Sequence, residues 1–228
     1  MKSNRLFIVF DTETTGLTKQ SLNKINLPVS INMRGSEVCQ IGGIILNEGM
    51  VPLKLFCHYC DVVSASSQPA AYNTHKINQR EIRYYLVGQF LPEVMTKYLP
   101  EFFAEDVIFI GYNSEFDMTM VAQSLANSPL SWKWKRVTAS IVPRHGRYSV
   151  DVAEYFKQGS SYRRLSSFER ELDTMRLQFI SYYEKRLSVQ TNCIELLDKE
   201  WGHAHNSLFD SINTFLLWSD KIWKKKLV

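Results

Sequence analysis

The chain has 228 residues with 27 basic and 23 acidic side chains, so its net charge of +4 does not by itself indicate a nucleic-acid partner. Hydrophobic residues make up 45% and charged residues 22%, which excludes disordered and fibrous proteins, and four scattered cysteines exclude a disulfide-stapled scaffold. The apolar runs are too short to span a membrane and the N-terminus lacks signal-peptide features, so we expect one cytoplasmic domain over residues 1–228, without membrane contact.

Three apolar segments come first along the chain. Leu6–Phe10 is a short run of strand-forming residues, and Val38–Leu46 and Val51–Tyr59 are two more. Asn47-Glu48-Gly49-Met50 separates the last two and is typical of a hairpin turn, because Asn and Gly tolerate unusual backbone angles. We therefore expect three strands, of which the second and third form a hairpin.

Helices alternate with single strands in the rest of the chain. An amphipathic helix begins near Pro92, and the short strand Val107–Gly111 precedes a helix around Met118–Leu125. Ser149–Val152 predicts a last strand. Helical patterns follow it at 165–172, at 176–201, where they are less regular, and at 208–222. This order predicts an α/β fold with a mixed sheet of about five strands flanked by helices.

Basic residues gather beside tryptophans in two places. The stretch from Met118 to Val150 contains no acid. Its aromatic and basic residues are Trp132, Lys133, Trp134, Lys135, Arg136, Arg144 and Arg147, and the C-terminal tail places Lys221, Lys224, Lys225 and Lys226 around Trp223. Cations beside aromatic rings suit a phosphate backbone with stackable bases. A solvated loop and a helix end whose lysines complement the helix dipole are the alternatives.

Asp11 and Glu13 stand two residues apart, directly after the first predicted strand. If the chain stays extended through Thr12, both carboxylates lie on the same side of the strand. Two such carboxylates repel each other, and a divalent cation relieves that repulsion best. The alternative is an exposed acidic turn.

Two more acids and a histidine stand near predicted helix starts. Asp117 lies in GYNSEFD, and Asp210 lies in HNSLFD, five residues after His205. Each acid follows a serine by three residues, Ser114 or Ser207, so each also fits a capping box that closes a helix N-terminus. His205 is expected in a loop, free to swing toward a substrate, although a lone histidine there is more often a surface residue.

The motifs FDTETTGL, NSEFD and HNSLFD, in this order, resemble those of the DEDDh 3′–5′ exonucleases, a family that includes the proofreading subunit of bacterial DNA polymerase III, ribonuclease T and oligoribonuclease. The resemblance extends through QIGGIIL, Thr74–Ile77 and Tyr148–Tyr155, so it covers nearly the whole chain. The sequence departs from the family at Lys76, where glycine is usual, at Ser207, where alanine is typical, and in the longer segment 176–201. The resemblance implies a ribonuclease-H-like sheet.

The resemblance also implies roles for individual residues. Two Mg²⁺ or Mn²⁺ ions would be held by Asp11, Glu13, Asp117 and Asp210, with Asp11 shared by both ions and His205 acting as general base toward water. The implied substrate-binding residues are Thr12, Thr14, Thr15, Leu17, His75 and Asn113. Among them, the backbone of Thr12–Thr15 would hold the terminal 3′-OH, Leu17 would wedge against the last base, and His75 and Asn113 would line the pocket.

The leading hypothesis is a 3′–5′ exonuclease that releases nucleoside 5′-monophosphates from single-stranded or frayed DNA. The nearest alternative acts on RNA ends, and a third possibility is an inactive nucleic-acid-binding or polymerase-docking module. The sequence identifies neither a polymerase or other protein partner nor an oligomeric state. Cys57-His58-Tyr59-Cys60 has no second ligand pair at zinc spacing, so we expect free thiols there.

Overall fold

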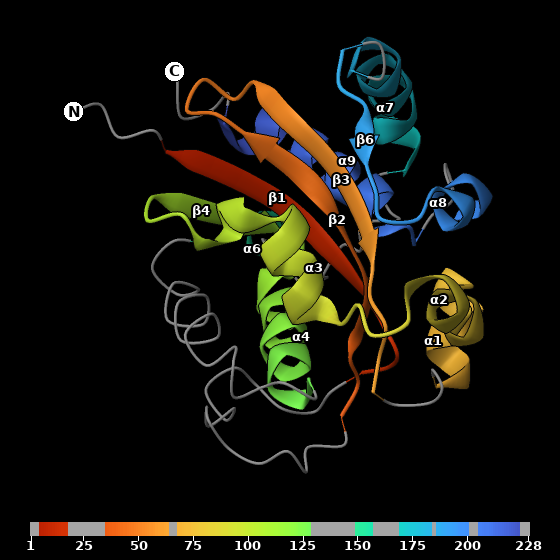
Figure 1. Ribbon diagram of the computed structural model, residues 1–228. Coiled ribbons are helices and arrows are strands. Elements are labelled where there is room, and N and C mark those ends of the chain that lie inside the picture. Colours follow the sequence, from red (N-terminus) through yellow and green to blue (C-terminus); the bar gives the residue numbers. More distant parts are fainter. Residues whose placement is uncertain are drawn as a thin grey trace.

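The computed structural model describes residues 5–17, 35–63, 68–128, 149–156, 169–183, 186–200 and 205–223. A twisted sheet runs through this part of the molecule, and helices pack on both of its faces (Figure 1). The basic tryptophan-rich segment, the predicted helical positions 165–168 and the lysines at 224–226 lie outside the described residues, as do the side chains at 221–223. No helix that the structure describes has the length and apolar character needed to cross a membrane.

The sheet has six strands in the order β5-β4-β1-β2-β3-β6. Successive antiparallel pairs join β1, β2 and β3, whereas β4 pairs parallel with β1, β5 with β4 and β6 with β3. The strands are β1 (Leu6–Thr14), β2 (Val38–Leu46), β3 (Pro52–Tyr59), β4 (Val107–Gly111), β5 (Ser149–Asp151) and β6 (Val189–Gln190). The α/β fold with a mixed sheet is thus confirmed, and β6 is the strand that the sequence did not predict.

Eight α-helices lie within the described residues. They are α1 (Pro69–His75), α2 (Gln79–Leu86), α3 (Leu91–Tyr98), α4 (Ser114–Asn127), α6 (Val152–Phe156), α7 (Glu169–Tyr183), α8 (Ile194–Glu200) and α9 (Ser207–Leu217). A 3₁₀ turn, η2 (Pro100–Phe103), follows α3, and a π turn, η6 (Trp218–Trp223), follows α9. The predicted helical segment 176–201 is divided, because α7 ends at Tyr183 and β6 adds to the edge of the sheet before α8 begins.

The side chains of β1 divide between two apolar cores. Phe7 and Val9 belong to the core under α9 and α7, whereas Ile8 and Phe10 belong to the core under α3, α4 and η2. This division follows from the two-residue period of a strand, which sends neighbouring side chains to opposite faces. Phe10 makes edge contacts in its core with Phe102 and Phe109, at centroid distances of 5.5 and 6.0 Å.

β1 continues past the predicted end at Phe10, so Asp11 and Glu13 lie within the strand. Asp11 pairs with Gly42 of β2, and Glu13 pairs with Gln40. Because the alternation continues, these two carboxylates face the same side as Phe7 and Val9, which is the side covered by α9. The chain is therefore extended through Thr12, as the sequence hypothesis required.

Gly42 allows α9 to approach the strand beside Asp11. A Cβ at this position would clash with the backbone N of Leu208 and lie 2.5 Å from Ser207 Oγ. We expect Gly42→Ala to lower the free energy of unfolding by about 2–3 kcal/mol, because backbone rather than a flexible side chain must move. Gly49→Ala is the matched control, since its Cβ would meet Asn47 Oδ1 at 3.4 Å. Urea denaturation of both variants tests this prediction, and equal midpoints would contradict it.

Candidate functional site

Asp117 reaches β1 from the opposite face of the sheet to Asp11. It lies in the first turns of α4, which begins just after the parallel neighbour of β1 ends at Gly111. Its Oδ1 accepts a 3.1 Å hydrogen bond from the backbone N–H of Thr12 and a 2.8 Å bond from Thr12 Oγ1. Thr12 therefore ties α4 to β1 and places the buried Asp117 carboxyl beside the Asp11–Glu13 pair.

The start of α9 brings His205 and Asp210 to Glu13 at the end of β1. Asn206 is the N-cap, and its Oδ1 accepts hydrogen bonds from the N–H groups of Leu208 and Phe209. The backbone N–H of Ser207 donates to Gln40 Oε1 at 2.7 Å, which fixes the helix start to β2 opposite Glu13. Within α9, Asp210 then lies one turn from the cap.

The capping-box interpretation of both acidic motifs was wrong. Ser114 and Ser207 are the first helical residues, and the N-caps are Asn113 and Asn206. Asp210 does reach back, since its Oδ2 accepts a 3.2 Å hydrogen bond from the backbone N–H of His205.

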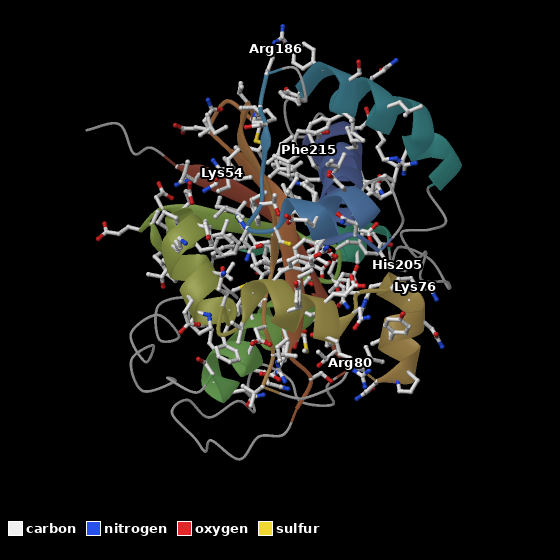
Figure 2. All side chains as sticks on the ribbon, turned by 45° about the vertical axis from the view of Figure 1, so that its right-hand side comes forward. Lys54, Lys76, Arg80, Arg186, His205 and Phe215 are labelled. Atoms are coloured by element: carbon white, nitrogen blue, oxygen red, sulfur yellow. The ribbon has the colours of Figure 1, made fainter. Side chains whose placement is uncertain are left out.

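A cluster of possible metal ligands results. Ligand atoms of Glu13, His205 and Asp210 all lie within 4.8 Å of one another. Asp11 interacts electrostatically with Asp117, Asp210 and Glu13. Three segments that are distant in sequence thus bring all five predicted catalytic residues together at the end of β1. His205 is exposed and has φ of 65°, and it lies on the side of the molecule seen at the right of Figure 2.

Burial and mutual repulsion dominate the electrostatics of this cluster. Burial, followed by the charges of Asp117, Asp210 and Glu13, raises the pKa of Asp11 well above its ordinary value. Burial also raises the pKa of Asp117 to about 8, although the hydrogen bonds from Thr12 act in the opposite direction. Oxygen ligands that repel one another in this way fit a hard divalent cation such as Mg²⁺ or Mn²⁺.

The metal-free protein should therefore respond to pH through Asp117. Its carboxyl ionises near 3.8 in the unfolded chain but near 8 in the fold, so it stabilises the fold fully below pH 4 and loses this effect as the pH rises toward 8. We expect the melting temperature of wild type in EDTA to fall relative to that of Asp117→Asn between pH 5 and 8. Added Mn²⁺ should restore wild type most at pH 8. Parallel melting curves for the two proteins at every pH would contradict this prediction.

The predicted substrate-binding residues occupy different environments. Leu17 is 77% exposed, next to the cluster in sequence. The backbone N–H groups of Thr12 and Thr15 already donate within the protein, to Asp117 Oδ1 and to the carbonyl oxygen of Glu37. Thr14 Oγ1 donates to the carbonyl oxygen of Gly16.

His75 and Asn113 both act on the backbone around the cluster. His75 is buried; its Nδ1 accepts from the N–H of Ile77, so its Nε2 carries the proton and donates to the carbonyl oxygen of Thr14 at 3.1 Å. Burial, and then the neighbouring His205, lower its pKa. Asn113 has φ of 70°, and its backbone N–H donates to Asp151 Oδ1 at 2.9 Å. Both residues thus hold the ends of β1 and α4 in place.

Sequence reasoning gave no role to three residues that position the site. Asp151 binds the N–H groups of Asn113 and Ala153 with one oxygen, and so joins the starts of α4 and α6. Gln40 and Asn206 fix the start of α9. The only signals in the sequence were the Asn before Ser207, which is a good N-cap type, and Asp151 within the segment Tyr148–Tyr155 that the family resemblance included.

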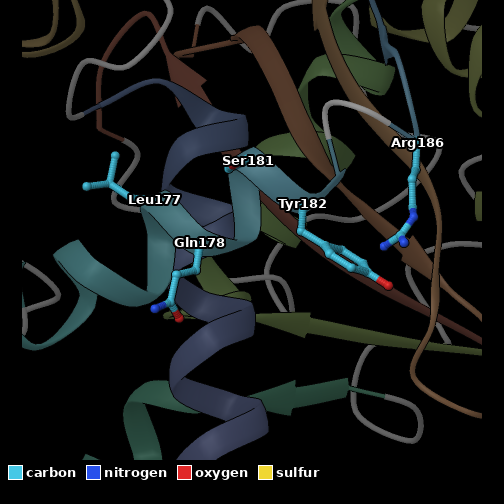
Figure 3. Close-up of a pocket in the computed structure, with 5 residues that line it drawn as sticks. All are labelled: Leu177, Gln178, Ser181, Tyr182 and Arg186. Atoms are coloured by element: carbon cyan, nitrogen blue, oxygen red, sulfur yellow. The ribbon is translucent and has the colours of Figure 1, made fainter.

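A surface cavity of about 680 Å³ lies elsewhere, on α7. It is lined by Leu177, Gln178, Ser181, Tyr182 and Arg186 (Figure 3). The Arg186 guanidinium lies 3.7 Å from the centroid of the Tyr182 ring, so these two side chains stack on each other. None of the five predicted catalytic residues lines this cavity, and Figure 2 places Arg186 and His205 in different parts of the molecule.

No protein-family model matches the sequence. No curated protein matches it either. Solved structures match by fold: E. coli exonuclease I in complex with a dA16 oligonucleotide is 17% identical with a TM-score of 0.51, over 96% of this chain and 42% of that chain. A moderately thermophilic exonuclease I from Methylocaldum szegediense is 16% identical with a TM-score of 0.52, over 96% and 41%. A zinc-bound complex of E. coli exonuclease I with single-stranded DNA is 18% identical with a TM-score of 0.52, over 98% and 41%.

These similarities establish the fold of the chain. They confirm the ribonuclease-H-like α/β architecture that the three motifs implied, and the fold neighbours are exonucleases, in agreement with the resemblance. The chain spans about two fifths of the length of those proteins.

Proposed function

We propose that this protein is a metal-dependent 3′–5′ exonuclease that removes nucleoside 5′-monophosphates from the 3′ end of single-stranded DNA. The observation that carries the proposal is the convergence of Asp11, Glu13, Asp117, His205 and Asp210 at one end of β1. A purely structural role does not account for this arrangement, because buried acids that repel one another destabilise a fold unless a cation joins them.

The four carboxylates are the proposed ligands of two divalent ions. Asp11 lies among the other three acids and is the residue that both ions would share. Thr12 occupies Oδ1 of Asp117, which leaves Oδ2 for an ion or for a water bound to it. When bound, such ions activate a water and stabilise the charge that develops on the phosphate and the leaving oxygen.

His205 is the proposed general base. Its backbone N–H is held by Asp210, whereas its ring is exposed and lies within reach of the carboxylate cluster. An imidazole nitrogen with a free electron pair is suited to accept the proton of the attacking water.

The end of β1 is the proposed seat of the 3′ terminus. Leu17 is exposed and positioned after the strand to wedge against the last base. The backbone of Thr12–Thr15 is proposed to hold the terminal 3′-OH of the substrate. His75 supports this segment through its hydrogen bond to the carbonyl oxygen of Thr14, and Asn113, the N-cap of α4, is proposed to line the pocket with it. Single-stranded DNA is favoured over RNA because the fold neighbours include complexes of exonuclease I with DNA oligonucleotides.

Labelled oligonucleotides test this function. With Mg²⁺ or Mn²⁺, 5′-labelled single-stranded DNA should shorten stepwise, 3′-labelled DNA should lose its label first as a mononucleotide, and EDTA should stop both reactions. Faster shortening of RNA than of DNA would assign the site to RNA ends instead. Failure to shorten either polymer with either metal would overturn the proposed function.

A further inference from the structure

Helix α1 ends beside the carboxylate cluster. The backbone N–H of Gln68, just before α1, donates to the carbonyl oxygen of Thr15, and His75 in its last turn donates to that of Thr14. Two hydrogen bonds therefore fix α1 to the end of β1. The next residue, Lys76, is the C-cap of α1 and lies on the same side of the molecule as His205 in Figure 2. His75 also lies near His205, whose charge contributes to lowering the pKa of His75.

Lys76 has a backbone conformation that disfavours its own side chain. It is the C-cap of α1 with φ of 61° and ψ of 7°, in the left-handed region where glycine is favoured. Its contribution to the helix end is a backbone hydrogen bond, from its N–H to the carbonyl oxygen of Tyr72, which glycine would make equally well. The lysine side chain is thus not required by the helix end that it caps.

The Lys76 side chain is available to a ligand. It is exposed, and Nζ lies 6.0 Å from the centroid of the Tyr72 ring. Tyr72 is itself 43% exposed. The ion pairs found among the described residues join Arg5 to Asp106, Lys54 to Glu101 and Arg83 to Asp61, and none of them involves Lys76.

A cation and a partly exposed aromatic ring next to the site match the chemistry of a single strand. Lysine neutralises a backbone phosphate, and a tyrosine ring stacks on a base of any sequence. We propose that Tyr72 and Lys76 form a subsite for the nucleic-acid segment adjoining the cleaved terminus, with Lys76 on a phosphate and Tyr72 on a base. This inference rests on the proposed function.

Lys76→Gly separates this role from a structural one, because the two effects have opposite signs. Removing Cβ from a left-handed residue should raise the melting temperature by about 2 °C. Losing the phosphate contact should raise KM for a 5′-fluorescein oligo(dT) about three- to fivefold at low salt, with kcat within about twofold of wild type. The slope of log KM against log salt should fall by about 0.7, the value for one phosphate of a single strand.

Three further variants and one control separate the contribution of the Lys76 charge from that of the Tyr72 ring. Lys76→Gln keeps the strained backbone and removes the charge, so it should reproduce the rise in KM without the rise in melting temperature. Tyr72→Leu should raise KM about fivefold or more, whereas Tyr72→Phe should behave as wild type. Lys97→Gln is the matched control, because Lys97 also lies over a tyrosine, Tyr98, at 4.8 Å, on α3 away from this site.

The outcomes distinguish the subsite from the proposed function. If wild type shortens the oligonucleotide and both Lys76 variants keep its KM and salt slope, the subsite is overturned and the exonuclease stands. If Lys97→Gln raises KM as much as Lys76→Gln, the effect belongs to overall charge and the subsite is likewise overturned. If wild type shortens neither DNA nor RNA, the proposed function itself is overturned.

Discussion

Asp11→Ala should lower the rate of 3′-terminal hydrolysis by about 10³-fold or more. Asp11 is the acid that lies among the three others, so removing it takes away the ligand that both proposed ions share. The fold should tolerate the change well, because burial and like charges raise the pKa of this carboxyl and make it unfavourable in the metal-free protein. We therefore expect an inactive variant that melts, in EDTA, at or above the temperature of wild type.

Asp106→Asn is the matched control for this variant. Asp106 pairs with Arg5 at 2.9 Å on the surface, and an exposed pair of this kind contributes little to stability. Its replacement should leave the rate unchanged. If Asp11→Ala keeps more than about a tenth of wild-type activity with Mg²⁺ and Mn²⁺, Asp11 is not a shared metal ligand.

His205→Ala should lower kcat by about 10²–10⁴-fold while metal binding remains largely intact. The reason is that the imidazole is the proposed proton acceptor, and the four carboxylates stay in place without it. Steady-state kinetics and Mn²⁺ titration of the same preparation measure both properties.

His205 has φ of 65°, so a second variant is needed to separate lost chemistry from backbone strain. His205→Asn suits this purpose, because asparagine adopts the left-handed region more readily than alanine. Both variants should lose activity alike. Activity within threefold of wild type in either of them would remove the general-base role.

The strands that pass through the core were predictable, because their apolar runs are bounded by turn residues. The end of β1 was harder to predict. Its last four residues, Asp11–Thr14, are polar, and they stay in the sheet because β2 supplies Gly42 and Gln40 as partners. Hydrophobic periodicity does not predict a strand end made of polar residues. The same polar residues nevertheless indicated a candidate site.

Two other features depend on tertiary contacts that local sequence does not specify. Strand β6 has only two residues, Val189 and Gln190, and it exists because the edge of β3 offers unpaired backbone groups. The helix caps were misassigned by one residue. The Asn206 side chain caps α9 in place of the following serine, whereas α4 begins after Asn113, whose backbone is left-handed and whose side chain makes no capping hydrogen bond. The gathering of acids was foreseen from motif order, whereas the supporting bonds from Thr12, Gln40 and Asp151 required the fold.

Anomalous diffraction from a crystal grown with Mn²⁺ tests the central claim most directly. It should show two manganese peaks bound by the carboxylates of Asp11, Glu13, Asp117 and Asp210, with Asp11 touching both, and neither peak in the Asp11→Ala crystal. Manganese peaks confined to other parts of the molecule, with these four carboxylates bound to no ion, would contradict it.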